Sequence, residues 1–164
     1  MRTEDIRELL RAHGAKPGHV ELVLRAWAQG LPLASGRQRP ENFLPAQFRA
    51  ALPVISEELA ALARARSEHV GADGSTRILI GLADGQTVES VLLPRDGVCV
   101  STQVGCAVGC VFCMTGRDGL IRQLGSAEIV AQVVLARQRQ PVKKVVFMGM
   151  GEPAHNMDLS LIHI

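Results

Sequence analysis

The stretch Gly105-Cys-Ala-Val-Gly-Cys-Val-Phe-Cys-Met-Thr-Gly116 lies at the centre of the only part of the sequence that alternates between strand and helix patterns. An extended run precedes it at residues 98–103, and a helical pattern begins after it at residue 126. A short apolar run of the kind found in buried strands follows at residues 143–148. Strand, loop, helix and strand in this order predict a βαβ unit, and therefore the start of a parallel α/β sheet.

Three cysteines, Cys106, Cys110 and Cys113, stand within eight residues of this stretch. Cysteine thiolate is the usual ligand of iron–sulfur clusters, and a complete set for a four-iron cluster is four. Three thiolates suit three corners of such a cluster and leave the fourth iron without a protein ligand. An iron with an open position can bind a ligand that reacts, and S-adenosylmethionine (SAM), held through its amino and carboxylate groups, is the best known.

Two other interpretations of these cysteines remain open. One is a zinc site that Cys99 completes. Structural zinc sites usually take two close pairs of ligands, however, and Cys99 stands alone seven positions upstream. The other is a set of buried, inert cysteines, which would be unusual for three cysteines in one glycine-rich loop.

The rest of the chain divides into a helical part and a β-rich part. Apolar residues at helical spacing predict four helices, at residues 3–14, 17–30, 43–52 and 56–67. Beyond Gly71 the spacing becomes that of strands, and the pair Asp84-Gly85 between two such runs is a strong hairpin signal. We therefore expect an α/β fold with an N-terminal helical accessory domain (1–69), a β-hairpin segment (70–98) and an α/β core after it.

The composition is that of a folded globular protein, with 47% hydrophobic and 21% charged residues among 164. The net charge of +2 is too small to indicate a nucleic-acid partner, although most basic residues are arginine, which matches phosphate and base stacking well. No apolar run reaches the roughly 18 residues that a membrane span needs, and the N-terminus has no signal-peptide pattern. These features favour a cytoplasmic protein without a membrane partner.

Three further positions have both a functional and an ordinary interpretation. Gly149-Met-Gly-Glu-Pro153 follows a strand at its carboxyl end, where ligands bind in α/β sheets. Its glycines let the backbone approach a ligand and Glu152 can accept a hydrogen bond from an ammonium group, but a tight turn is the simpler explanation. Glu89 shares a strand face with Val91 and Leu93, and is most simply a solvated carboxylate on an edge strand. Cys99 is most simply a small apolar residue in a strand.

Several motifs follow one another in order between residues 98 and 156: Val-Cys-Val-Ser-Thr-Gln-Val-Gly-Cys, Phe-Cys-Met-Thr-Gly, Arg-Gln-Leu and Met-Gly-Met-Gly-Glu-Pro. In this combination the chain resembles the dual-specificity radical SAM methyltransferases that act on adenine carbon-2 of ribosomal RNA and transfer RNA. It equally resembles their paralogues, the adenine carbon-8 methyltransferases that confer antibiotic resistance. The stretch Glu89-Ser-Val-Leu-Leu-Pro94 also resembles a glutamate-containing strand of that family.

The resemblance implies that the residues after 98 begin a partial (β/α) radical SAM barrel. It implies methylation of an adenine ring carbon by a 5′-deoxyadenosyl radical and a methyl-carrying cysteine. The implied partners are ribosomal RNA, transfer RNA as a second substrate, and an electron donor such as flavodoxin. The site residues that it implies are the 4Fe-4S ligands Cys106, Cys110 and Cys113, the SAM contacts Gly151 and Glu152, the proton acceptor Glu89, and Cys99, which resolves a covalent protein–RNA intermediate.

Two features depart from the family. Its methyl-carrying cysteine lies near the end of a chain roughly twice this length, and nothing here matches it. The barrel part (99–158) holds one strand, one helix and a second strand, and the tail at 159–164 does not continue the family pattern. We therefore expect this polypeptide alone not to complete the methylation. The alternatives are a non-catalytic iron–sulfur or zinc module that binds RNA, and a radical SAM reaction on a small molecule.

Overall fold

The computed structural model describes residues 1–36 and 39–160, so the end of the predicted tail, residues 161–164, lies outside the described residues. The helices and strands that it describes are, in chain order, α1 (Thr3–Ala12), α2 (Pro17–Ala28), η1 (Pro40–Asn42), α3 (Ala46–Ala61), β1 (Arg64–Val70), β2 (Thr76–Gly81), β3 (Thr87–Leu93), β4 (Gly97–Cys99), β5 (Gln103–Gly105), η2 (Met114–Gly116), β6 (Leu120–Gln123), α4 (Ser126–Arg137), β7 (Lys144–Val146), η3 (Pro153–Asn156) and α5 (Met157–Ser160). The η elements are single turns of 3₁₀-helix.

The N-terminal part contains the first two predicted helices, but the third and fourth are wrong. In their place α3 is one continuous helix that contains Pro53. Proline removes one backbone donor from a helix. Phe48, Ile55 and Leu59 of α3 are all buried, however, and tertiary burial of this kind supplies most of the stability of a helix in a protein.

Strand β1 is a second correction, because its residues were expected to belong to the helical part. β1 pairs antiparallel with β2, from Arg64 opposite Gly81 to Val70 opposite Thr76. Nearly all of its side chains are exposed, so its sequence carries no alternation of buried and exposed positions that would predict a strand. The pairing with β2 therefore determines its conformation. The domain boundary proposed at residue 69 stays a prediction.

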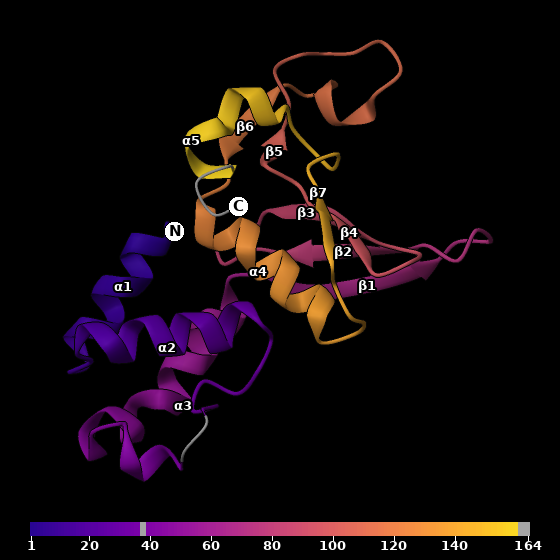
Figure 1. Ribbon diagram of the computed structural model, residues 1–164. Helices are drawn as coiled ribbons and strands as arrows, with labels where there is room; N and C mark the ends of the chain where they lie inside the picture. The colour runs from indigo at the N-terminus through magenta and orange to yellow at the C-terminus, as the bar shows by residue number, and fades with distance from the viewer. Residues whose placement is uncertain (37–38, 161–164) are drawn as a thin grey trace.

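Five strands form one sheet in the order β1-β2-β3-β4-β7, and Figure 1 shows α4 running across one of its faces. The first four strands pair antiparallel, whereas β4 and β7 pair parallel. The parallel pair joined through α4 confirms the predicted βαβ unit. The extended run predicted at 98–103 is divided between two sheets, because β5 turns away from β4 and pairs with β6.

The main core lies between the sheet and the helices. On β3, Val88, Ser90 and Leu92 are buried and alternate with less buried residues, as predicted, and the Ser90 hydroxyl donates to Gln132 of α4. Helix α4 also joins the N-terminal helices to the sheet, since the Arg137 guanidinium donates to the Ala28 carbonyl at the end of α2. Within the described residues, no helix has both the length and the apolar composition that crossing a bilayer requires.

Candidate functional site

Two chain segments meet at the carboxyl ends of the parallel strands β4 and β7. Residues 100–103 continue from β4, and residues 147–153 continue from β7. The Gly149 N–H donates to the Val100 carbonyl (3.1 Å), and the Thr102 N–H donates to the Met150 carbonyl (2.8 Å). This end of the sheet is the place where α/β proteins bind their ligands. Residues 100–103 and segment 149–153 therefore meet at the end of the sheet where the sequence predicted a ligand site.

The cysteine loop, defined here as residues 106–119, leaves β5 and returns as β6 (Figure 1). Its ends are tied together, because the Cys106 N–H donates to the Gly119 carbonyl (3.0 Å). Gly105, just before the loop, has a φ of 74°, and a Cβ there would lie 2.1 Å from the Gly119 carbonyl oxygen. Only glycine has both the backbone freedom and the small size that this close contact between the two ends of the loop requires.

All four cysteines are free, but their surroundings differ. Cys110 and Cys113 are exposed and Cys106 is half-buried, whereas Cys99 is buried in β4. The side chain of Thr115 and its backbone N–H donate to Cys113 and lower the pKa of this thiol. Burial raises the pKa of Cys99, and the hydrogen bond from the Met148 backbone opposes this only in part. Because metals bind thiolate, Cys113 suits metal binding better than Cys99 does.

The type and number of thiols in the cysteine loop match three corners of an iron–sulfur cluster. A structural zinc site needs four ligands around one ion. Among residues 1–36 and 39–160, no three His, Cys, Asp or Glu side chains are grouped closely enough to hold one ion. A cluster binds each thiolate through a different iron atom. Three free thiols on one loop, with Cys99 buried in the sheet, supply the donor type and number for three of those iron atoms.

The cysteine loop also exposes large apolar side chains. Val111, Phe112 and Met114 are 102%, 88% and 71% exposed. Ile121 of β6, just after the loop, is 59% exposed, and Met148 beyond β7 is 80% exposed.

Glu89 and Cys99 lie on the same face of the sheet. Val91 pairs directly with Cys99, and Glu89 is two residues from Val91 on the same side of β3. This is the face opposite α4, since Ser90 contacts Gln132 from the other side. β3 lies between β2 and β4, so the interpretation of Glu89 as an edge-strand residue is wrong. Its carboxylate is 41% exposed and lies 3.7 Å from the Arg77 guanidinium, a pair that contributes little at a surface.

The glycines of segment 149–153 are explained first by packing. A Cβ on Gly149 would lie 2.7 Å from both the Ser101 hydroxyl and the Val100 carbonyl oxygen. Gly151 has a φ of 97°, and a Cβ there would lie 2.5 Å from Cβ of Gln103. The close approach that was predicted toward a ligand is thus made toward residues 100–103 of the protein. The Glu152 carboxylate accepts the Ala154 N–H (2.9 Å) at the start of η3.

Buried polar side chains beneath this segment were not predicted from the sequence. We call Ser101, Gln103, Gln132 and Asn156, which are all buried, the polar cluster. The Ser101 hydroxyl accepts from the Met150 N–H (2.8 Å) and donates to the Glu89 carbonyl (2.5 Å). Asn156 donates to the Thr102 carbonyl (2.6 Å). The polar cluster therefore connects β3, β5 and the segment after β7. The one signal for it in the sequence is the polar run Ser-Thr-Gln directly after a buried strand.

Arg122, part of the Arg-Gln-Leu motif, fixes the base of the cysteine loop. Its guanidinium donates to both oxygens of Glu128 in α4 (3.0 and 2.8 Å) and to Asp84 in the β2–β3 turn (2.6 Å). The hydrogen bond from Arg122 lowers the pKa of Asp84. Burial raises the pKa of Glu128, but its bonds from Arg122 and from the Gly125 N–H outweigh burial and leave this pKa low. The motif thus has a structural explanation.

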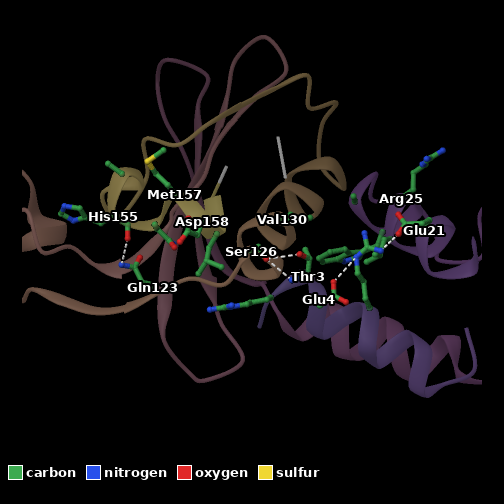
Figure 2. Close-up of a pocket in the computed structure, with 18 residues that line it drawn as sticks. Thr3, Glu4, Glu21, Arg25, Gln123, Ser126, Val130, His155, Met157 and Asp158 are labelled. Carbon is green, nitrogen blue, oxygen red and sulfur yellow. Dashed lines mark hydrogen bonds and ion pairs between the residues drawn. The ribbon is translucent and has the colours of Figure 1, made fainter. Parts of the chain in front are cut away.

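A large cavity lies away from the cysteine loop. It measures about 1090 Å³ and lies between α1 and α2 on one side and α4, η3 and α5 on the other (Figure 2). Glu21 and Ser126 are among its lining residues, but none of the four cysteines is. The Thr3 N–H of α1 donates to the Ser126 hydroxyl of α4 across the cavity (Figure 2), and the Arg7 guanidinium of α1 donates to Glu21 of α2 on the N-terminal side. The cavity therefore lies between the N-terminal helices and the α/β part, and it shares Asn156 with the polar cluster but contains none of the cysteines.

Comparison with known proteins agrees with this geometry. Residues 100–164 match the radical SAM superfamily. A solved structure described as a radical SAM methyltransferase from Sphaerobacter thermophilus superposes with a TM-score of 0.69 at 33% sequence identity. That similarity covers 98% of this chain and 48% of the other. The fold is thus mixed α/β and similar to that of a radical SAM methyltransferase, as the sequence predicted.

Curated relatives are similar over nearly the whole chain. A protein of Dechloromonas aromatica named "Probable RNA methyltransferase" is 69% identical over 160 residues, which cover 96% of this chain and 45% of that protein. A protein of Aromatoleum aromaticum with the same description is 72% identical over 158 residues, which cover 96% of this chain and 44% of that protein. This chain spans about half the length of the curated relatives that it matches.

Proposed function

We propose that this chain is the cluster-carrying part of a radical SAM enzyme that methylates an adenine ring carbon of RNA. The observation that carries the proposal is the junction of two features at one end of the sheet. Segment 149–153 follows the parallel strand β7 and is hydrogen-bonded to residues 100–103, which lead from β4 through β5 into the loop with three free thiols. The radical SAM match begins at residue 100 and includes both features.

In this proposal Cys106, Cys110 and Cys113 hold a 4Fe-4S cluster whose fourth iron is open. Such a cluster, when bound, supplies the electron that cleaves SAM to a 5′-deoxyadenosyl radical. Gly151 and Glu152 hold SAM beside it. Their segment has the rigidity for this role, because the backbone of residues 149–152 is bonded to Val100, Ser101 and Gln103. The exposed apolar side chains of the cysteine loop are covered when the site is occupied.

Glu89 and Cys99 have the proposed roles of proton acceptor and resolving thiol. An adenine ring carbon is not a nucleophile and cannot take a methyl group from SAM by ordinary polar transfer. When the carbon–carbon bond is made instead with a methyl group carried on a cysteine, the adenine is left covalently attached to the protein. A base must then remove the ring proton, and a second thiol must attack the sulfur of the methyl-carrying cysteine, so that a disulfide forms, the carbon–sulfur bond breaks and the released carbon takes up a proton. Burial raises the pKa of Cys99 and so disfavours its thiolate form in the chain without cofactors. The two residues share one sheet face, as these roles require.

The substrates and partners in the proposal follow the relatives' names and the sequence resemblance. They are ribosomal RNA, transfer RNA as a second substrate, and an electron donor such as flavodoxin, with the protein acting in the cytoplasm. No residue matches the methyl-carrying cysteine of the resembled family. We therefore predict that this chain, with SAM, a reductant and RNA, forms no methyladenine. Mass spectrometry of digested RNA checks this, and a methylated product would contradict it.

Anaerobic reconstitution tests the cluster. The chain should take up about four iron atoms and a similar amount of inorganic sulfide. The Cys99→Ala variant should take up the same amount, because this cysteine is buried apart from the loop. Uptake of one zinc ion that Cys99→Ala abolishes would instead support the non-catalytic module.

A further inference from the structure

Two glutamines stand opposite each other at the base of the cysteine loop. Gln103 of β5 and Gln123 of β6 are direct partners in the antiparallel pair. The Gln103 side-chain amide donates to the Gln123 side-chain oxygen (3.0 Å). Gln103 is fully buried, so its amide has no access to solvent water as an alternative partner.

Both glutamines also bind the segment that follows β7. The Gln103 side-chain oxygen accepts the Glu152 N–H (2.9 Å). The Gln123 side-chain amide donates to the His155 carbonyl (3.0 Å), a bond drawn in Figure 2. The three bonds run in one direction, from the Glu152 N–H through Gln103 and Gln123 to His155. They begin and end on the same segment, and therefore hold it at two points.

The packing around Gln103 leaves this arrangement little freedom. Gly151 lies against the Gln103 side chain so closely that a Cβ at position 151 would be 2.5 Å from Cβ of Gln103 and 2.6 Å from its Cγ. Each amide atom in the line has a partner of the correct kind, so reversing one amide would break two bonds. The strands that carry the cysteine loop and the segment after β7 therefore form one unit.

We propose that Gln103 and Gln123 are positioning residues, which hold segment 149–153 at a fixed distance and orientation from the loop that carries Cys106, Cys110 and Cys113. The inference rests on the proposed function, in which that segment contacts SAM and that loop holds the cluster. Neither glutamine touches the reacting atoms. Their effect is on where SAM can lie relative to the open iron.

Hydrogen exchange of the chain without its cofactors tests the mechanical part. Gln103→Met removes both side-chain bonds at nearly constant size. Gln103→Glu keeps an acceptor for the Glu152 N–H, but its carboxyl can donate to Gln123 only while it is protonated. We expect the Glu152 amide to exchange about tenfold faster in Gln103→Met and by a smaller factor in Gln103→Glu. Gln140→Met is the matched control, since Gln140 donates to the Leu93 and Gly97 carbonyls at the other end of the sheet.

If the Glu152 amide exchanged equally faster in Gln103→Met and in Gln140→Met, Gln103 would contribute only to the general stability of the fold. That result would overturn the proposal. No acceleration at Glu152 in either Gln103 variant would overturn it as well. If Gln103→Met fails to fold, the exchange rate of the Glu152 amide in Gln103→Glu decides the question, because this variant keeps a side-chain oxygen at position 103 that can accept the Glu152 N–H.

A SAM titration of the cluster-loaded chain tests the functional part. Its readout is the change that SAM causes in the electron paramagnetic resonance (EPR) signal of the reduced cluster. Gln103→Met should load the same amount of iron as the unsubstituted chain but need about tenfold more SAM for half of the change. Gln140→Met should need the unaltered amount. An unaltered midpoint in Gln103→Met would refute the positioning role and leave the proposed function intact. A chain without cluster or SAM response would refute the proposed function, and hydrogen exchange would still decide the role of the glutamines.

Discussion

The cysteine loop and the polar cluster lie next to each other but are opposite in character. The loop exposes two of its three thiols and several large apolar side chains. The polar cluster beneath it is buried, and each of its four side chains makes hydrogen bonds to neighbouring strands or segments. Burying so many polar groups is costly unless their bonds are made.

This difference indicates that the two regions have separate roles. The polar cluster and Arg122 determine where the loop begins and ends, while the loop itself leaves its donors free for a ligand. A ligand-binding loop on a rigid base is a common arrangement, because the base fixes the geometry and the loop supplies the chemistry. Substitutions in the two regions should therefore have opposite effects on metal binding and on stability.

The largest effect is expected from loss of a loop cysteine. Cys113→Ala should abolish cluster uptake, because the loop then offers two thiolates. The free energy of unfolding without metal should change by less than about 0.5 kcal/mol, since the side chain is exposed. Iron analysis and urea denaturation measure the two quantities. A Cys113→Ala chain that still holds four irons would remove this cysteine from the ligand set.

A methyl group at position 151 should have the reverse effect on the apo chain. Gly151→Ala places a Cβ within 2.5 Å of Gln103 at a φ of 97°, and we expect a loss of about 3 kcal/mol in the free energy of unfolding. Gly85→Ala is the matched control. Gly85 has a φ of 85° but open space around it, so about 1 kcal/mol is expected there. Equal losses in the two variants would show that segment 149–153 is not tightly packed.

The ion pair at the base of the loop should have a smaller, pH-dependent effect. Glu128→Gln should cost about 2 kcal/mol at neutral pH, less than a fully buried pair because Arg122 is 29% exposed. The control Glu68→Gln, whose carboxylate is 42% exposed against 7% for that of Glu128, should cost about 0.5 kcal/mol.

The folded-state pKa of Glu128 is lowered, so its contribution is fully present above the ordinary glutamate pKa of about 4.3 and is lost as the pH falls through the folded-state value. The stability difference between the unsubstituted chain and Glu128→Gln should therefore shrink in acid. A difference that stays constant down to pH 3 would contradict the pairing with Arg122.

The sequence predicted the parts of the fold that depend on local patterns. The βαβ unit, the Asp84-Gly85 hairpin and the cysteine loop all follow from short-range spacing. Strand β1 was missed because its exposed side chains carry no alternating pattern, and only its pairing with β2 makes it a strand. Continuity of α3 through Pro53 depends likewise on distant packing.

The site was predicted as a set of residue types, and its supporting structure was not. Cysteine spacing indicates a ligand set directly, because few structures need three thiols in one loop. A glutamine such as Gln103 has no such signal, since glutamine is usually exposed and its burial is decided by partners 20 and 49 residues away. The glycines at 149 and 151 were recognised as positions of close approach, but the surface that they approach is the protein itself.

The open iron is tested most directly by EPR of the chain after anaerobic reconstitution and reduction, recorded with and without SAM labelled at its amino nitrogen. We expect the spectrum of a four-iron cluster that shifts when SAM is added, with a magnetic coupling to the labelled nitrogen. A cluster with four protein thiolates, or one whose spectrum does not change when SAM is added, would contradict the proposal that Cys106, Cys110 and Cys113 leave one iron open to bind SAM.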